Sequence, residues 1–334
     1  MILLTGATGY LGRRLAAALT AAGLPLRALV RASSDTSELR RLAPGCELVT
    51  GDLNDPLSLL DACQDVDTVV HAAALVSFQT ADRDRMLLVN GEGTANLVNM
   101  ALEAGVRRLV HISSVAVLDR RDGGPVVTLR ERWPAERPNT SYAESKFAAE
   151  REVWRGQAEG LEVAVLYPTH MLGAGDWQHE HAPALWRLAA AERGFYPTGT
   201  TGFVDVDDVV DAVLFVLERD NDGDRFLLNA ENLSWREALT LIARSIGARP
   251  PTYEMARWQS GLLWPLELVR SYFSGSPPLI TKESHQNVQA DFRYGGSAYA
   301  AARGRPYRDI RQTITAAGAA YLAERGGPEE SSDD

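Results

Sequence analysis

A tyrosine and a lysine stand four residues apart in the segment Tyr142-Ala143-Glu144-Ser145-Lys146. On a helix, this spacing puts the phenol and the ammonium one turn apart on the same face. A free tyrosine titrates near pH ~10, too high for proton exchange at neutral pH, whereas a nearby cation favours the phenolate and lowers the pKa of the phenol. The pair therefore predicts acid–base chemistry in which Tyr142 exchanges a proton with a reacting oxygen.

A serine can join this pair from the end of a predicted strand. The apolar run at 107–113 reads as a buried strand, and Ser114 follows it directly. At the carboxyl edge of a parallel sheet, the Ser114 hydroxyl can hydrogen-bond a substrate carbonyl beside the phenol. We therefore expect Ser114, Tyr142 and Lys146 to form the catalytic set, with Lys146 also reaching the ribose hydroxyls of a nucleotide.

The beginning of the chain carries a glycine-rich turn with the pattern of an anion site. A short apolar run passes through Gly6, Gly9 and Gly12 into an Ala- and Leu-rich helical pattern. Gly6 permits a tight turn, Gly9 lets the backbone approach a pyrophosphate, and Gly12 lets the helix pack closely on the strand. The free N–H groups and the dipole of the helix N-terminus favour phosphate. The residues expected to bind a dinucleotide here are Gly6, Thr8, Gly9, Tyr10, Leu11 and Gly12.

These residues need a framework of alternating strands and helices, which the first half of the chain supplies. We predict strands at 1–5, 25–31, 47–50, 67–72, 107–113 and 162–168, and helices at 9–22, 35–43, 56–63, 83–104 and 140–159. Further on, we predict a helix at 205–219, a strand at 224–229, and helices at 234–246, 257–274 and 308–324. The expected fold class is α/β, a Rossmann-type doubly wound parallel sheet with a smaller C-terminal mixed α/β part that binds the substrate.

The order of the patterns suggests how the chain is divided. Residues 1–168 are expected to form the NAD(P)-binding core, and 169–325 mainly the substrate-binding part, with 204–229 returning to the core. Residues 326–334 combine glycine, proline, serine and acidic residues, a composition typical of a disordered tail.

Composition excludes several classes of partner. The net charge of the 334 residues is −10, which argues against nucleic acid, since phosphate-backbone binding needs clustered cations. The two cysteines, Cys46 and Cys63, lack metal-ligand spacing, so we expect no metal site and a reducing compartment. Neither a signal peptide nor a long apolar span is apparent in the sequence, and we expect a cytoplasmic protein without a transmembrane segment.

The residues after the next strands bear on the choice of dinucleotide. An acid at the end of the second strand is typical of NAD sites, whereas an Arg accommodates the 2′-phosphate of NADP; here Arg31 occupies that place. We therefore predict NADP(H), with NAD as the alternative. Asp52 and Leu53 follow the third strand, where Asp52 either accepts from the adenine amino group or initiates a turn. Small side chains lie where backbone must pass close to the nucleotide, at Ala72, Ala73 and Ala74.

Taken together, these motifs resemble those of extended short-chain dehydrogenases/reductases, the NAD-dependent epimerase/dehydratase superfamily. The matching pieces are the glycine turn, Gly51-Asp52-Leu53, His71-Ala72-Ala73-Ala74, Val89-Asn90-Gly91-Glu92-Gly93-Thr94, Ile112-Ser113-Ser114, Tyr142 to Lys146, and Tyr167-Pro168-Thr169. The resemblance implies Ser114, Tyr142 and Lys146 as the catalytic serine, tyrosine and lysine. It also implies that Ile112, Ser113 and the stretch from Tyr167 through Pro168 and Thr169 to Met171 lie beside the cofactor.

Within this superfamily, the residues around Ser114 favour one reaction. Dehydratases carry an acidic pair after the serine and sugar epimerases usually a Tyr-Gly, but this chain has Val115-Ala116-Val117-Leu118. The Leu29-Val30-Arg31 ending of the second strand and Leu172-Gly173-Ala174-Gly175-Asp176-Trp177 after the sixth resemble the dihydroflavonol-reductase-like branch. That resemblance implies hydride transfer between NADP(H) and a ketone or aldehyde. A nucleotide-sugar epimerase or dehydratase with tightly bound NAD stays an alternative, as does a non-catalytic NADP sensor.

The substrate is expected to be a small carbonyl or alcohol compound of apolar character. The segment 258–269 is unusually apolar, and it either lines the substrate cleft, touches a membrane surface or packs on the core. The resemblance also leaves a homodimer possible, through the helices at 83–104 and 140–159. Candidate substrate contacts are Ser77, Phe78, Ser114, Val115, His170 and Trp177.

Overall fold

A seven-stranded sheet organises the part of the chain that the computed structural model describes, which is residues 1–77, 79–118, 126–129, 140–175, 177, 183–192, 194–219, 222–256, 259 and 288–325. Every neighbouring pair of its strands is parallel. The strands are β1 (Ile2–Thr5), β2 (Leu26–Val30), β3 (Glu47–Thr50), β4 (Thr68–His71), β5 (Arg108–Ile112), β6 (Glu162–Pro168) and β10 (Asp224–Leu228). Their order, β3-β2-β1-β4-β5-β6-β10, reverses direction between β1 and β4. The predicted Rossmann-type fold class is confirmed.

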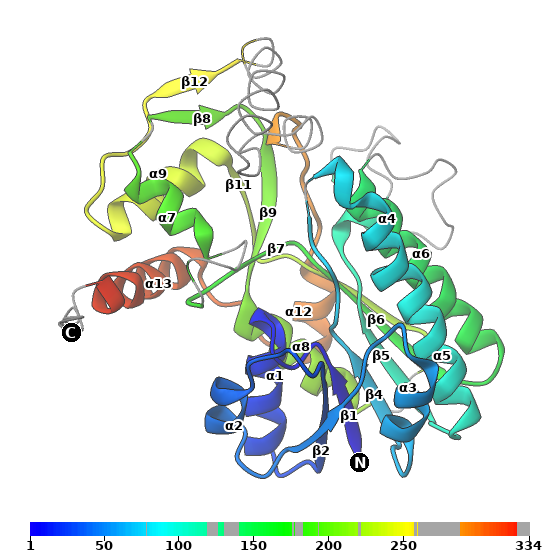
Figure 1. Cartoon of the computed structure of the whole chain (residues 1–334). Helices are drawn as coiled ribbons and strands as arrows, with labels where there is room; N and C mark the ends of the chain where they lie inside the picture. The colour runs from blue at the N-terminus through cyan, green and yellow to red at the C-terminus, as the bar shows by residue number, and fades with distance from the viewer. Residues whose placement is uncertain are drawn as a thin grey trace.

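Helices cover both faces of this sheet (Figure 1). One face carries α1 (Tyr10–Ala21), α2 (Ser37–Leu42), α8 (Val206–Leu217) and α12 (Ser297–Arg303), and the other α3 (Pro56–Cys63), α5 (Gly93–Glu103) and α6 (Ser141–Ala158). Neighbouring residues of a strand point to opposite faces, so Leu4 packs with Leu15 of α1 whereas Leu3 packs with Val153 of α6. Burial on both faces explains why the strands are nearly continuous apolar runs.

The predicted helix at 83–104 is wrong as a single element. It consists of α4 (Arg83–Met86), a π-helical turn at Leu87–Glu92, and α5. Such a turn adds one residue to the helical period and commonly marks a functional position. The hydrophobic pattern runs through it without a break, which is why the sequence alone does not indicate it.

Two small sheets lie beyond the carboxyl ends of the main strands (Figure 1). The first combines β7 (His170–Leu172), β9 (Thr200–Asp205) and β11 (Glu231–Ser234), and the second pairs β8 (Phe195–Pro197) with β12 (Tyr253–Met255). Three helices pack beside them, α7 (Ala184–Ala190), α9 (Trp235–Ser245) and α13 (Ile310–Arg325). The predicted helix at 234–246 is α9, and a capping box begins it, since Ser234 and Glu237 bond to each other's backbone. The predicted helix at 257–274 falls outside the described residues except at 259, and so does the predicted tail at 326–334.

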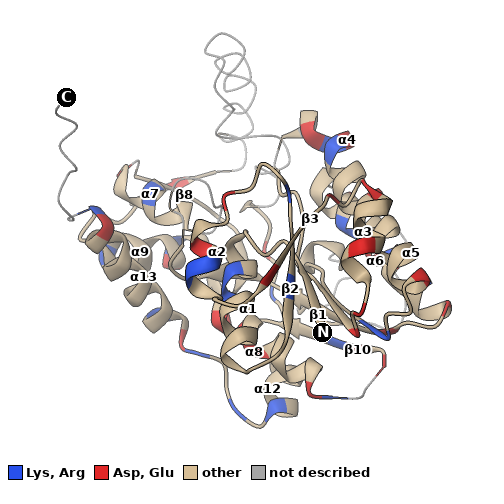
Figure 2. Cartoon of the chain, turned by 60° about the horizontal axis from the view of Figure 1, so that its bottom comes forward, with Lys and Arg blue, Asp and Glu red and all other residues tan. Residues whose placement is uncertain are grey.

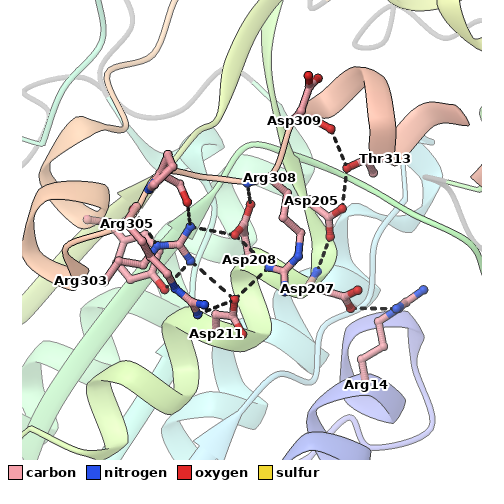
Figure 3. Close-up of polar contacts among 12 residues, drawn as sticks. Arg14, Asp205, Asp207, Asp208, Asp211, Arg303, Arg305, Arg308, Asp309 and Thr313 are labelled. Atoms are coloured by element: carbon pink, nitrogen blue, oxygen red, sulfur yellow. Dashed lines mark hydrogen bonds and ion pairs between the residues drawn. The ribbon is translucent and has the colours of Figure 1, made fainter. Parts of the chain in front are cut away.

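A buried set of charges attaches the C-terminal segment to the core, and Figure 3 shows it. Asp208 of α8, 1% exposed, accepts from the guanidinium groups of Arg303 (3.0 Å) and Arg308 (2.9 Å). Asp211, one turn further along, accepts from Arg308 at 2.9 Å and contacts Arg303 at 3.6 Å. We call Asp208, Asp211, Arg303 and Arg308 the C-terminal clasp. Because each charge faces an opposite charge directly, the clasp joins segments almost a hundred residues apart.

Acidic and basic residues are interspersed on the helices visible in Figure 2. Surface ion pairs such as Arg13–Glu38 and Arg27–Glu47, both 3.0 Å, contribute to this mixture. In the described part of the chain, no helix is long and apolar enough to cross a membrane.

Candidate active site

The glycine turn connects β1 to α1. It lies next to the point in the sheet, between β1 and β4, where the strand order reverses. Gly6 has φ +72°, and a Cβ there would lie 2.7 Å from the backbone of Ala73. A Cβ on Gly12 would overlap the carbonyl oxygen of Gly6. Gly9, by contrast, is exposed, and its Cβ would meet only that same oxygen, at 3.4 Å. The turn therefore leaves the N-terminus of α1 open on its outer side, where a pyrophosphate has room to bind.

Tyr142 and Ser114 meet at the carboxyl edge of β5. Thr140 caps α6 by accepting from the N–H of Ala143 (3.1 Å), which places Tyr142 in the first turn of the helix. Burial raises the pKa of the Tyr142 phenol, and a hydrogen bond with the Ser114 side chain opposes part of that rise. Lys146 does not lower the pKa of Tyr142 in this structure, contrary to the expectation from the sequence. The phenol therefore keeps its proton at neutral pH.

Lys146 lies one turn further along α6 and is buried. Its Nζ donates to the backbone oxygen of Ile112 at 2.7 Å, which directs the ammonium toward the end of β5. Burial lowers the pKa of Lys146 to about 8, and the charge of Glu150 opposes this shift. The sequence contains only one other lysine, Lys282, among its 34 basic residues. The position four residues after Tyr142 therefore stands out in a chain that otherwise uses arginine.

Asn90 in the π-helical turn connects α6 to the loop after β4. Its Oδ1 accepts from the N–H of Leu75 (2.7 Å), and its Nδ2 donates to the Leu75 carbonyl (2.9 Å) and to the Ser145 hydroxyl (2.9 Å). Ser145 in turn donates to the backbone oxygen of Tyr142 at 2.8 Å. The sequence shows an asparagine in the matching motif, but only the turn reveals what its side chain does.

Two histidines lie side by side on β4 and β5, with ring centroids 5.1 Å apart. The Thr94 hydroxyl donates to the Asn90 carbonyl (2.5 Å), so Nε2 of His71 must carry the proton and donate to Thr94 (2.9 Å). Nδ1 of His71 then accepts from Thr5 at the end of β1 (2.7 Å). This fixed tautomer connects the glycine turn to the catalytic helix through neutral groups. His111, fully buried, has no hydrogen-bond partner for either ring nitrogen within the described residues.

Three predicted cofactor residues lie along the β2–β3 edge in different environments. Arg31 is exposed at the end of β2 and forms no ion pair with any residue that the structure describes. Asp52 accepts from the N–H of Asn54 at 2.9 Å, the turn-forming arrangement that the sequence left open. Leu53 is buried and packs closely on α5, since a Cβ added to Gly93 would lie 2.8 Å from the Cβ of Leu53. Of the three, Arg31 is the side chain best placed to bind a ligand.

Two predicted cofactor residues turn their side chains away from the sheet edge, toward a carboxylate that the sequence analysis missed. Ser113 donates to Glu150 at 2.6 Å, and the Tyr167 hydroxyl donates to it at 2.5 Å. Glu150 is four residues after Lys146, so the sequence already indicates that both lie on the same face of the helix. The burial of Glu150 appears only in the structure. We call His71, His111, Lys146 and Glu150 the buried polar layer beneath α6.

The residues after β6 lie at the junction with the small sheets. Thr169 donates twice to the Leu228 carbonyl, from its N–H and its hydroxyl, while Pro168 ends β6 and Met171 packs against the α1 side of the core. His170 is exposed, and its ring lies on Trp235 (5.4 Å) and Phe203 (5.7 Å). This exposed imidazole over two aromatic rings remains a candidate substrate contact.

The other predicted substrate residues are dispersed. Trp177 is buried between Trp186 and Tyr321 and donates to Glu324 at 2.8 Å, so packing accounts for its position. Ser77 donates to Asp82 at 2.6 Å within its own loop. Val115 is buried in the short turn after Ser114, and Phe78 lies outside the described residues. The described side chains include no group of three or more histidines, cysteines or acids that could hold a metal ion.

The parallel α/β fold agrees with comparison to known proteins. A family model described as the NAD dependent epimerase/dehydratase family matches residues 2–228. The chain belongs to this family. It is an NAD(P)-dependent oxidoreductase of the extended short-chain dehydrogenase/reductase type.

Similar proteins of known name include reductases. The chain is 35% identical over 263 residues to sterol demethylase protein B of Methylococcus capsulatus, covering 75% of this chain and 77% of that protein. It is 28% identical to a putative dihydroflavonol 4-reductase of Synechocystis, over 93% and 91% of the two chains. A ketoreductase of Stigmatella aurantiaca, which acts on a 4-hydroxy-2-methyl-3-oxo-4-farnesyl-3,4-dihydroquinoline-1-oxide, is 32% identical over 73% of both. The predicted resemblance to the dihydroflavonol-reductase-like branch is confirmed.

A solved structure gives the same answer for the fold. The crystal structure of gox2253 superposes with a TM-score of 0.81 at 30% identity and covers 98% of this chain and 99% of that one.

Proposed function

We propose that this enzyme reduces a ketone or aldehyde to an alcohol with NADPH, at a site formed by Ser114, Tyr142 and Lys146. The observation that carries the proposal is the protonated Tyr142 phenol, hydrogen-bonded to Ser114 and one helical turn from the buried ammonium of Lys146. A phenol that keeps its proton at neutral pH is suited to donate it to a carbonyl oxygen as that oxygen becomes an alkoxide. The protonated phenol is the form that reduction requires.

Each residue of the set has a separate task. Ser114 donates a hydrogen bond to the substrate carbonyl oxygen and keeps it beside the phenol. Tyr142 transfers its proton to that oxygen. Lys146 stabilises the resulting phenolate by its positive charge, which requires the ammonium to be present when the proton leaves.

The residues present fit a bound NADPH. When bound, the dinucleotide supplies the hydride that the carbonyl carbon receives. The glycine turn and the N-terminus of α1 would hold the pyrophosphate, since Gly9 is exposed there and adjacent protein atoms leave space. Arg31 would bind the 2′-phosphate, because its guanidinium is exposed and unpaired with the described acids. The proposal of NADP over NAD rests on Arg31.

We further propose an apolar substrate. The names of two relatives refer to a sterol and to a farnesyl-substituted quinoline oxide, which are bulky apolar compounds. The ring of His170 contacts the rings of Trp235 and Phe203 at the start of the small sheets. This aromatic group offers a surface on which an apolar substrate could pack.

The experiment is to measure NADPH oxidation by the purified chain with a panel of sterol-like and aromatic ketones, aldehydes and nucleotide sugars. We expect oxidation with apolar carbonyls, at a 1:1 ratio of alcohol formed to NADPH consumed. Interconversion of nucleotide sugars without net cofactor consumption would replace the proposal with the epimerase alternative. Binding of NADPH without turnover of any panel member would favour the non-catalytic sensor.

A further inference from the structure

A fully engaged carboxylate lies directly behind the catalytic lysine. Glu150 is 2% exposed on the inner face of α6, one turn beyond Lys146. Its Oε2 accepts from Ser113 (2.6 Å), and its Oε1 accepts from Tyr167 (2.5 Å) and from the indole of Trp154 (3.1 Å). A carboxylate with this many hydrogen-bond donors is stabilised in its charged form even when it is buried.

Two of the three donors come from the ends of the strands that carry the predicted site, while Trp154 lies on α6 itself. Ser113 immediately precedes Ser114 at the end of β5, and Tyr167 precedes Pro168 and Thr169 at the end of β6. Lys146 bonds to the same end of β5 through the Ile112 carbonyl. The hydrogen bonds of Glu150 and Lys146 therefore fix the ends of β5 and β6 against α6, next to the residues that would touch substrate and cofactor.

Among the buried residues of α6, Lys146 is the one cation that accompanies Glu150. From β10, Arg225 donates to the Tyr167 hydroxyl at 3.2 Å and lies over the rings of Trp154 and Tyr167. From β4 and β5, His71 and His111 face Lys146, and burial keeps both imidazoles neutral. The described residues place no other acid in the buried polar layer to balance Lys146.

We propose that Glu150 is a positioning residue for the reduction proposed above, which clamps the ends of β5 and β6 to the catalytic helix and keeps Lys146 charged. The inference rests on the proposed function for its kinetic consequence only. Without Glu150, burial acts on Lys146 unopposed, and the ammonium that supports the Tyr142 phenolate loses its proton closer to neutral pH.

The chain permits a direct test, because it has two lysines. In the Lys282→Arg variant, labelling with ¹³Cε-lysine gives a single side-chain resonance, and its pH titration reports Lys146 in the cofactor-free protein. We expect a pKa of about 8 before Glu150 is changed. Glu150→Gln should lower it by about one to two pH units, the size expected for losing an opposite charge one helical turn away at an effective dielectric constant of ~20.

The matched control is Glu152→Gln, the same change on the same helix at a carboxylate that pairs with Arg155 on the surface at 2.8 Å. It should leave the Lys146 titration within about 0.2 pH units. In NADPH-dependent reduction, the fall of kcat at high pH should move with the Lys146 titration in Glu150→Gln and stay in place in Glu152→Gln.

The clamp is tested separately by Tyr167→Phe and Ser113→Ala, which leave the charge of Glu150 in place. Ser113→Ala removes one hydrogen bond to Glu150, whereas Tyr167→Phe removes one to Glu150 and the one that its hydroxyl accepts from Arg225. Each variant should lower kcat about 3- to 10-fold, with KM for NADPH and the Lys146 titration unchanged. These two variants also test the proposal if Glu150→Gln does not fold. An unchanged Lys146 titration in folded Glu150→Gln, or unchanged kcat in both clamp variants, would overturn the proposal. A wild type that reduces no carbonyl would defeat the proposed function, while the titration would still decide the role of Glu150.

Discussion

The C-terminal clasp and the buried polar layer beneath α6 both place charges inside the protein, in opposite ways. In the clasp, Asp208 and Arg303 touch at 3.0 Å with side chains 1% and 4% exposed, so each charge meets its counter-charge. In the polar layer, Lys146 bonds to a carbonyl, and Glu150 to hydroxyl and indole groups. Direct pairing favours the charged forms of the clasp residues, whereas burial without a directly bonded carboxylate lowers the pKa of Lys146 into a range that chemistry can use.

The largest effect on stability is expected in the clasp. Asp208→Ala removes the buried acceptor of Arg303 and of the backbone N–H of Arg308, and leaves Arg303 its 3.6 Å contact with Asp211. Removing one partner of a buried ion pair costs about 3–5 kcal/mol of unfolding free energy, and because Asp211 stays in place we expect the lower end of that range. Urea denaturation followed by circular dichroism measures this. Asp211→Ala is the matched control with a smaller expected loss, because Asp211 is more exposed, at 19%. Equal losses in both variants would remove the distinction between a buried and a partly exposed pair.

The polar layer should instead make stability depend on pH. Burial lowers the pKa of His71 to about 3 and that of His111 well below its usual value of 6.5. Below pH 6.5 the two imidazoles bind protons in the unfolded chain but stay neutral in the folded protein. Stability therefore falls as the pH decreases from 6.5 toward the pKa values of the folded state. Each imidazole contributes about 1.4 kcal/mol per pH unit. Denaturation measured between pH 7 and pH 5 checks the slope.

His111→Leu sharpens this second test. His111 has no hydrogen-bond partner within the described residues, so an apolar side chain removes a titrating group without breaking a bond. We expect the slope attributed to the two histidines to be halved, with no loss of stability at pH 7. A slope that does not change would mean that His111 does not contribute to the acid sensitivity.

Arg31 differs from the arginines of the clasp because no described acid pairs with it. Its guanidinium is free to bind phosphate, and one charge-assisted hydrogen-bonded contact is worth about 1.5–3 kcal/mol. Arg31→Ala should therefore raise KM for NADPH about 10- to 100-fold, leave KM for NADH unchanged, and leave stability unaltered. Equal changes for both cofactors would contradict a 2′-phosphate site.

The smallest effect is expected for a surface pair at the margin of the clasp. Arg14 of α1 contacts Asp207 at 2.8 Å (Figure 3), with side chains 29% and 47% exposed. Arg14 also donates to the Ala174 carbonyl. Solvent screening limits such a pair to less than about 1 kcal/mol. Thermal denaturation of Arg14→Ala should show a small shift, and a loss as large as that of Asp208→Ala would show that exposure does not separate the two.

Local sequence patterns were enough to predict the parallel sheet and the elements that carry the proposed site. A few neighbouring residues determine each of three features, and the structure contains all of them: the turn at Gly6, the strand that ends before Ser114, and the helix that carries Tyr142 and Lys146. Their spacing is meaningful on a helix whatever packs against it.

The remainder depends on contacts between distant segments. Asp208 and Arg303 are 95 residues apart, and nothing near either residue indicates the other. Glu150 reads as one more charged residue on a helix until Ser113 and Tyr167 surround it. The π-helical turn at Asn90 keeps a helical hydrophobic pattern, and Trp177 reads as a loop aromatic although it is buried. Burial and side-chain direction are properties of the fold, and no local pattern encodes them.

The central claim is that Tyr142 donates the proton in a carbonyl reduction at this site. Tyr142→Phe keeps the ring and removes only the hydroxyl, so its turnover with NADPH and an apolar ketone tests the claim most directly. We predict a loss of kcat of about 10²- to 10⁴-fold with NADPH affinity and melting temperature unchanged. Full activity in the variant, or lost NADPH binding with kcat preserved, would contradict the account.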